Sequence, residues 1–157
     1  MFRNREISLF ITAVILVLVS ALLQNTEFLS FYGIKINLVL ALLLTFGFFI
    51  HNFWHYLTLS LEGILLLKIS PGLDKQTLAL FILVIAAFYL KKYLFWQPII
   101  NNVFLIIVAT ALFYLLIDFD FLIYNTATII LEAVYNVICG LVLYLILKRI
   151  YGEINVR

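Results

Sequence analysis

Residues 21–44 read ALLQNTEFLSFYGIKINLVLALLL, and this stretch decides the fold. One apolar run ends in it at Gln24, and a second apolar run begins at Asn37. The short segment between them contains several polar residues and Gly33, so it turns the backbone. Two apolar runs joined by so brief a connection predict a helical hairpin. The composition of the chain predicts that lipid surrounds this hairpin.

Composition favours an integral membrane protein. Of the 157 residues, 66% are hydrophobic and 11% are charged, whereas soluble domains have about 45–50% and about 25%. A chain this short could not hide so much apolar surface in one soluble core. In lipid the backbone must satisfy its own hydrogen bonds, and strict polar–apolar alternation is rare here, which favours helices over a β-barrel. The net charge of +2, with no basic run outside helix ends, argues against a nucleic-acid partner.

The apolar runs predict an all-α integral membrane protein, with six transmembrane helices forming a single bundle over residues 1–157. Crossing a ~30 Å hydrocarbon layer takes about 20 helical residues, with roughly 17 as the lower limit. The six stretches cover residues 7–23, 36–50, 53–69, 76–90, 99–117 and 126–147. The first could also be a cleaved signal peptide, but it exceeds the usual signal core of roughly 7–15 residues, and the hairpin needs it.

The basic residues predict the orientation of the bundle. If the N-terminus is cytoplasmic and all six helices cross, seven of the ten Lys and Arg residues lie on the cytoplasmic side. The other three, Lys35, Lys68 and Lys75, lie outside. This asymmetry obeys the positive-inside rule, so we expect both termini in the cytoplasm. The connections are too short for a separate domain, so we expect the protein to act within or at the faces of the membrane.

Glu62 lies near the middle of the third predicted helix. A charged carboxylate at the bilayer centre costs about 2.5–3.5 kcal/mol on insertion scales, so its presence needs a reason. One interpretation is a ligand for an ion or substrate, or a contact to another membrane protein. The other is a protonated or hydrogen-bonded group that fixes packing between helices.

The last predicted helix carries polar and small residues at intervals of four. These residues are Thr128, Glu132, Asn136, Gly140 and Tyr144. On a helix they share one slowly drifting face and leave the Ile, Leu and Val residues for lipid. Asn136 could form hydrogen bonds between helices, and Gly140 would let a neighbouring backbone approach. We interpret this face as an internal packing seam, with a binding site as the alternative.

No pattern in the sequence indicates catalysis, and we expect neither a metal nor another cofactor. His51 and His55 have a spacing that can bind a metal, but no cysteine or carboxylate stands near them in the sequence. Cys139 is the only cysteine, so an intrachain disulfide is excluded. Nucleophile elbows, Gly-rich phosphate loops and paired catalytic carboxylates are absent from the sequence.

The start of the chain resembles the MreD proteins, a family of small bacterial rod shape-determining membrane proteins. The residues that carry this resemblance are Leu22-Leu23-Gln24, Phe28-Leu29, Gly33-Ile34 and Asn37-Leu38-Val39-Leu40. In the family, a Leu-Gln step ends the first helix, and a short loop with a glycine leads to a second helix that opens Pro-Asn-Leu or Pro-Asp-Leu. Ile36 stands where the family has its proline.

The resemblance extends over nearly the whole chain. Further matching residues are Gly63, Leu65, Leu66, Leu67 and Ser70-Pro71-Gly72, then Tyr135-Asn136 and Leu143-Tyr144-Leu145-Ile146-Leu147-Lys148-Arg149. Lys68 replaces an aspartate that is common in the family's third helix. The length and the predicted number of helices also fit.

The resemblance implies a non-enzymatic scaffold in the bacterial cytoplasmic (inner) membrane. MreD proteins belong to the cell-elongation machinery that directs side-wall peptidoglycan synthesis. Their implied partner is the single-span protein MreC, and MreB, RodA and a class B penicillin-binding protein take part indirectly. Candidates for partner binding or interhelical polar contacts are Glu62, Glu132, Asn136 and Gly140.

The same resemblance supplies an alternative function. The MreD fold is similar to the substrate-binding subunits of energy-coupling-factor vitamin transporters, so the chain could hold a small ligand and dock on an energising module. Such subunits commonly carry an Ala-x-x-x-Ala docking face on their first helix. Here Ala13 is followed by Val17 and then Ala21, which interrupts that pattern and favours the scaffold.

Overall fold

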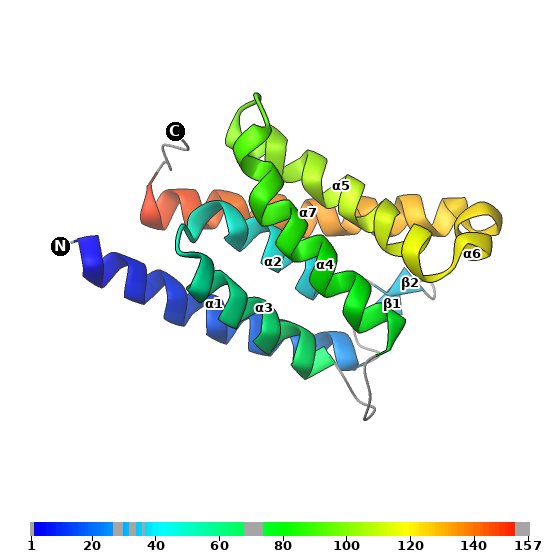
Figure 1. Ribbon diagram of the computed structural model, residues 1–157, viewed down its shortest axis with the longest axis horizontal. Helices are drawn as coiled ribbons and strands as arrows, with labels where there is room; N and C mark the ends of the chain where they lie inside the picture. Colours follow the sequence, from blue (N-terminus) through cyan, green and yellow to red (C-terminus); the bar gives the residue numbers. More distant parts are fainter. Residues whose placement is uncertain (1, 27–29, 32–33, 36, 68–73, 153–157) are drawn as a thin grey trace.

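The computed structural model describes residues 2–26, 30–31, 34–35, 37–67 and 74–152, which form an elongated bundle of helices (Figure 1). The elements are α1 (Phe2–Asn25), β1 (Ser30–Phe31), β2 (Ile34–Lys35), α2 (Leu38–Phe49), α3 (Phe53–Leu67), α4 (Lys75–Leu90), the short 3₁₀ helix η2 (Lys91–Tyr93), α5 (Pro98–Ile117), α6 (Phe119–Tyr124) and α7 (Thr126–Tyr151). The strands pair antiparallel, with Ser30 opposite Lys35 and Phe31 opposite Ile34. Within the described residues, the fold is therefore helical apart from this pair of two-residue strands.

Helices occupy all six stretches that the sequence predicts, but they differ in length. Four segments in the described residues are long and apolar enough to cross a membrane, and these are Arg5–Asn25, Lys75–Tyr93, Pro98–Ile117 and Thr126–Tyr151. Helices α2 and α3 have 12 and 15 residues, below the roughly 17 that a lone crossing needs. The architecture fits an all-α membrane protein, and six crossings stay a prediction.

Helix α6 lies in the connection between the predicted spans 99–117 and 126–147, where the sequence analysis expects no helix. Asp118 instead begins a short helix, and its side chain accepts a hydrogen bond from the Phe121 amide at 2.9 Å. An N-terminal cap of this kind satisfies an amide that the first helical turn leaves unpaired. The end of the third predicted span, at residues 68–69, lies outside the described residues.

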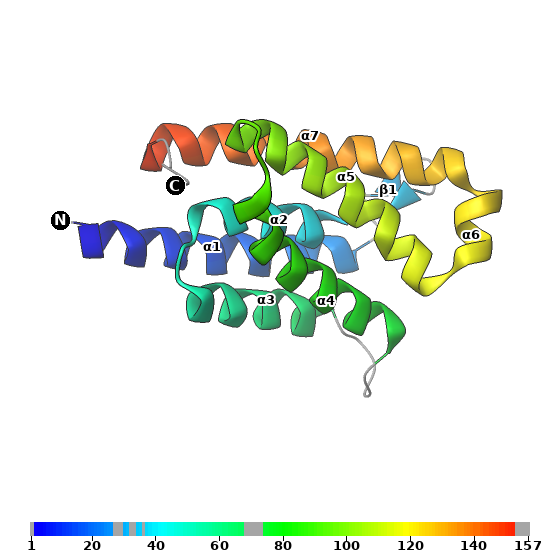
Figure 2. The ribbon, with the colours of Figure 1, turned by 45° about the horizontal axis from the view of Figure 1, so that its top comes forward.

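The shortest of the predicted spans lies at the centre of the bundle. Every residue of α2 from Val39 to Phe49 is buried, and α2 packs against α1, α3, α4, α5 and α7. Figure 2 shows α2 between α1 and α7. A helix that is apolar on all sides needs apolar surroundings on all sides, and here other helices supply them in place of lipid.

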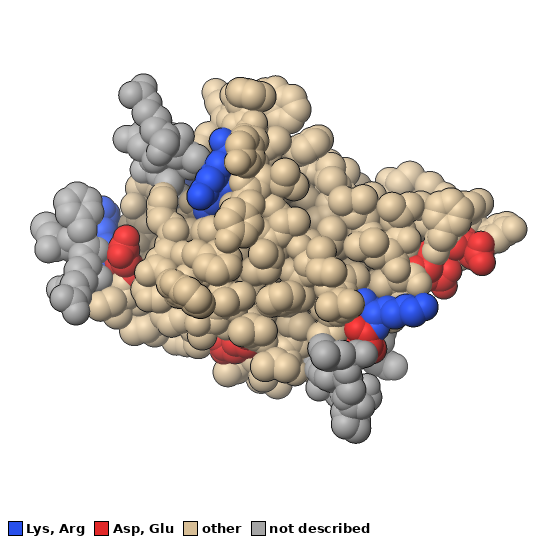
Figure 3. Space-filling view, in the orientation of Figure 1, with Lys and Arg blue, Asp and Glu red and all other residues tan. Residues whose placement is uncertain are grey.

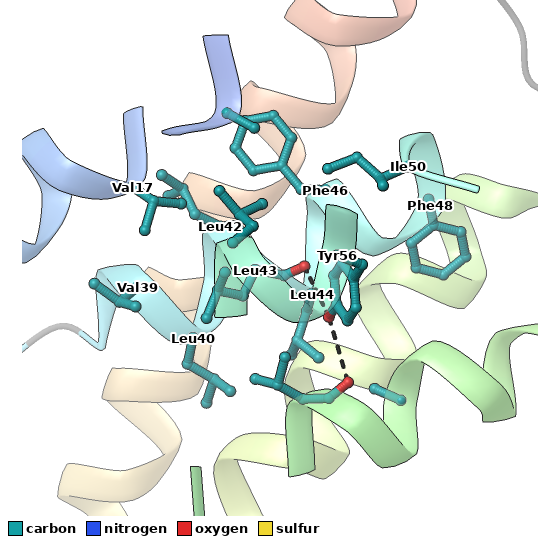
Figure 4. Packing of buried hydrophobic residues seen from close by; sticks show 14 of the residues in the cluster. Val17, Val39, Leu40, Leu42, Leu43, Leu44, Phe46, Phe48, Ile50 and Tyr56 are labelled. Atoms are coloured by element: carbon teal, nitrogen blue, oxygen red, sulfur yellow. Dashed lines mark hydrogen bonds between the residues drawn. The ribbon is translucent and has the colours of Figure 1, made fainter. Parts of the chain in front are cut away.

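Tyr56 of α3 connects α2 to α4 within the core. Its ring is fully buried and stacks on Phe88 of α4, with 4.6 Å between the ring centroids. Its hydroxyl reaches the carbonyl oxygens of Leu43 at 3.2 Å and Val84 at 3.3 Å. Figure 4 shows this hydroxyl between the two carbonyl groups, among the leucines and phenylalanines of α2.

Two polar residues fasten the α1–α2 hairpin that the sequence predicts. Gln24 Oε1 accepts a hydrogen bond from the Val39 amide at 3.0 Å, and Gln24 Nε2 donates to Asn37 Oδ1 at 3.4 Å. Asn37 Oδ1 also accepts from the Leu40 amide at 3.2 Å and so caps α2. The end of α1 and the start of α2 are thus held together by side chains of both helices.

The start of α1 and the end of α7 lie at the same end of the bundle (Figure 1). The Tyr151 hydroxyl is 3.1 Å from Thr12 Oγ1 and 3.4 Å from Ser8 Oγ. Along the outside of the bundle, large apolar side chains are exposed, as at Ile11, Ile138 and Val142. Charged side chains are sparse over the middle of the face in Figure 3. An apolar girdle of this kind suits contact with lipid.

Candidate functional site

The sequence-predicted face of α7 is buried from Glu132 to Tyr144, and Thr128 at its start is half-buried. Glu132 is 3% exposed and Asn136 is 0% exposed, and Gly140 and Tyr144 are buried further along the same face. This face packs on α5 and α2. Polar side chains enclosed in this way need hydrogen-bond partners inside the protein.

Helix α5 presents a matching face with the same spacing of four, made of Asn102, Ile106, Thr110 and Tyr114. The two helices run antiparallel, so the late residues of α5 lie opposite the early residues of α7. The Tyr114 hydroxyl donates a hydrogen bond to Glu132 Oε2. One turn further, Asn136 Nδ2 donates to Thr110 Oγ1 at 3.2 Å.

One turn further along α7, at Gly140, helix α2 joins the contact between α5 and α7. A Cβ atom at Gly140 would clash with Ile106 Cδ1 and lie 3.2 Å from Thr45 Oγ1 of α2. Only a glycine lets α7 approach both helices here without displacing Ile106. Asn102 Nδ2 donates to Thr45 Oγ1 at 3.3 Å, and Thr45 Oγ1 donates to the Ala41 carbonyl at 2.8 Å.

We call the side chains that form these bonds the polar ladder. Its members are Thr45, Asn102, Thr110, Tyr114, Glu132 and Asn136. The ladder contains one carboxylate, that of Glu132, which accepts a hydrogen bond from the Tyr114 hydroxyl. Its other side-chain groups are hydroxyls and amides. Such a set can fasten helices to one another, but it lacks the second carboxylate or the nucleophile–base pair that acid–base or covalent catalysis uses. Asn136 Oδ1 is buried without a hydrogen-bond partner.

Glu62 lies apart from the polar ladder. It is half-buried on α3, which packs on α1, α2 and α4. Its carboxylate makes no hydrogen bond or ion pair with any residue that the structure describes. The structure therefore brings together Glu132, Asn136 and Gly140 of the four sequence-predicted candidates, and it leaves Glu62 alone at the edge of a different helix.

Comparison with protein-family models, with curated proteins and with solved structures finds no match. The arrangement of the side chains and the resemblance described above therefore carry the functional argument.

Lys91 is a buried contact that sequence reasoning missed. Its side chain is 6% exposed, and Nζ donates to the carbonyl oxygens of Gly47 and of Ile50, the latter at 3.3 Å. Nζ also lies 4.1 Å from the centroid of the Phe88 ring. Two carbonyl groups at the C-terminal end of α2, which have no partner within the helix, thus meet a cation. Neighbouring Lys92 is exposed, and nothing in the sequence distinguishes the two lysines.

His51 and His55 lie at the same end of the bundle, beside a carboxylate that is distant in sequence. Glu6 of α1 and both histidines line a small recess of about 20 Å³ between α1 and the α2–α3 turn. The His55 ring lies 4.9 Å from the Phe10 ring. No group of three His, Cys, Asp or Glu residues within the described ranges is arranged to hold a metal ion.

The α5 half of the polar ladder was also missed, although the sequence contains a signal for it. Asn102, Thr110 and Tyr114 recur at multiples of four within an apolar run, as Glu132 and Asn136 do. Two stripes of equal spacing on different predicted helices indicate that the helices could face each other. The single stripe on the last helix predicts a seam but not which helix completes it.

The Tyr114–Glu132 bond predicts coupled effects on stability. We expect Tyr114→Phe and Glu132→Leu, each of which removes one partner of the bond, to lower the free energy of unfolding, and the double variant to lose less than the sum. The coupling should be about 0.6 kcal/mol, with an upper range near 1.7 kcal/mol, as for hydrogen bonds between membrane helices. Tyr124→Phe is a matched control, because Tyr124 is 83% exposed. Additive losses from the two substitutions would show that the bond carries no coupling. The measurement is unfolding in lipid bicelles.

Proposed function

We propose that the protein is a non-enzymatic scaffold of the bacterial cell-elongation machinery, similar to MreD, which binds an MreC-like single-span partner in the cytoplasmic membrane. The observation that supports this function is the enclosure of the polar ladder. The ladder side chains bond mainly to one another across α5, α7 and α2. The remaining surface for recognition is the outside of the bundle, where a membrane partner would bind.

The hairpin at the start of the chain adds support. Gln24 and Asn37 belong to the residues that carry the MreD resemblance, and both bond across the α1–α2 connection. The resemblance therefore coincides with side chains that have a physical task in the fold. Indirect partners of such a scaffold are MreB, RodA and a class B penicillin-binding protein.

We further propose that all six apolar helices cross the membrane, with both termini in the cytoplasm. Helix α2 rises only about 18 Å, but the carbonyl groups of Gly47 and Ile50 at its C-terminal end accept hydrogen bonds from Lys91 inside the bundle. The tie between Tyr151 and Thr12 supports a common side for the two chain ends. Reporter fusions at both ends should both report the cytoplasm, and opposite locations would refute six crossings.

The scaffold function is tested by co-purification from membranes. An affinity-tagged copy of the full chain should retain the MreC-like protein of the same cells after gentle solubilisation. An unrelated single-span protein of equal abundance is the matched control and should be lost. Tight binding of a radiolabelled vitamin, together with loss of the MreC-like protein, would replace the scaffold by the transporter alternative.

A further inference from the structure

Helices α1 and α3 lie side by side and run in the same direction, and Glu62 lies on the edge of α3 that meets α1. The Phe10 ring contacts the His55 ring near one end, and Asn25 Nδ2 donates to the Leu66 carbonyl at 3.0 Å near the other. Between them, a Cβ atom at Gly63 would lie 2.7 Å from Val17 Cγ1. Glu62 is seven residues after His55 and four before Leu66, so the three residues share one side of α3.

Glu62 lies level with the middle of α1, because a Cβ atom at the neighbouring Gly63 would meet Val17. Val17 belongs to the segment Arg5–Asn25, which is long and apolar enough to cross a membrane. It lies about 18 Å from one end of that segment and about 12 Å from the other. In a bundle that crosses the membrane as proposed above, lipid at this depth supplies hydrocarbon and no headgroup, so neither water nor a phosphate would solvate the carboxylate.

Neither the facing part of α1 nor the nearby Thr58 hydroxyl supplies a hydrogen-bond partner for the Glu62 carboxylate. Helix α1 carries only apolar residues from Ala13 to Val19, and the Thr58 hydroxyl donates to the Trp54 carbonyl at 2.9 Å. Glu132 and Lys91, two further ionisable side chains within the apolar segments, bond inside the bundle. Glu62 stands beside a seam whose outer rim is apolar and exposed, with Leu18 at 39%, Leu61 at 43% and Leu65 at 61%.

We propose that the seam between α1 and α3 around Glu62 is the docking site for a partner's transmembrane helix that carries a lysine or arginine near its middle. This inference rests on the proposed scaffold function and names the chemistry of the partner. A cation or other strong donor at mid-depth removes the unfavourable isolation of the carboxylate, and the leucines of the rim pack against the rest of the partner helix. A second copy of this chain would bring another carboxylate to the same place, where like charges repel.

Model peptides test this charge preference with the protein itself. The full chain, labelled with a donor fluorophore, is reconstituted in phosphatidylcholine vesicles with acceptor-labelled leucine-rich peptides of about 23 residues. The peptides carry Lys, Leu or Glu at their central position. We expect the Lys peptide to bind about tenfold more tightly than the Leu peptide, and Glu62→Leu to abolish this difference. Glu6→Gln is the matched control, because it removes an exposed carboxylate at the end of the bundle and should preserve the preference.

Several outcomes would overturn the docking site. Equal binding of the Lys and Leu peptides would do so, as would a Lys preference that survives Glu62→Leu in a variant with an unchanged circular-dichroism spectrum. Stronger binding of the Glu peptide, or self-association that Glu62→Leu abolishes, would indicate a second copy as the occupant.

Co-purification separates this inference from the scaffold function. If the MreC-like protein co-purifies equally with the original chain and with Glu62→Leu, the scaffold stands and the Glu62 site fails. If it co-purifies with neither, the scaffold itself fails.

Discussion

Replacing Tyr56 by alanine is expected to lower the free energy of unfolding by about 3–5 kcal/mol, the range for removal of a large buried aromatic ring. The ring is fully buried and stacked on Phe88, and its hydroxyl bonds to carbonyl groups of α2 and α4. Its loss leaves a cavity where three helices meet, because the packed side chains around it relax only partly. Unfolding of the purified protein in lipid bicelles measures the change.

Two further variants separate the cavity from the hydrogen bonds at Tyr56. Tyr56→Phe keeps the ring and removes the hydroxyl, so we expect a loss of only about 0.5–1.5 kcal/mol. Tyr93→Ala removes a tyrosine side chain that is 72% exposed, and we expect little change. If alanine and phenylalanine at position 56 had the same effect, packing of the ring would not be the source of the stability.

Replacing Lys91 by methionine is expected to lower the free energy of unfolding by about 1.5–3 kcal/mol, the range for hydrogen bonds to a charged group. Methionine fills a similar volume but leaves the carbonyl groups of Gly47 and Ile50 without their donor. We also expect faster hydrogen exchange in the last turn of α2, because that turn loses its support.

Lys92→Met is the matched control for this experiment. It makes the same change in formal charge one residue away, and Lys92 is exposed with its Nζ 5.9 Å from the centroid of the Tyr89 ring. We expect its stability and its hydrogen exchange to stay close to those of the original chain. Equal losses from both substitutions would assign the effect to net charge and not to the contact with α2.

The sequence predicts where helices form more readily than which helices meet. Long apolar runs indicate helices because the backbone in lipid has few other options, and α2 was expected from its run of leucines. Its central position was not expected, since an apolar helix can face lipid or other helices without any change of pattern. Asp118 is similarly compatible with a turn or with a helix cap, and its surroundings in the folded protein determine which of the two forms.

The candidate site was predictable in part for the same reason. The spacing of Glu132, Asn136 and Gly140 indicates a seam, while its completion by Tyr114 and Thr110 depends on α5 lying opposite α7. Lys91 and Lys92 are adjacent and chemically alike, yet only Lys91 points to the end of α2. Glu62 could be recognised as unusual from the sequence, but its lack of a partner is visible only in the structure.

The central position of α2 has a consequence for biosynthesis. The ribosome makes α2 before α4, α5 and α7, which later cover most of its surface. If α2 crosses the membrane as proposed above, acyl chains occupy in the interval the sides of α2 that these helices will take. Maturation is then an exchange, in which lipids leave α2 as each newly inserted helix packs against it. Variants that slow the arrival of α5 or α7 should prolong a lipid-coated precursor that quality-control proteases can recognise.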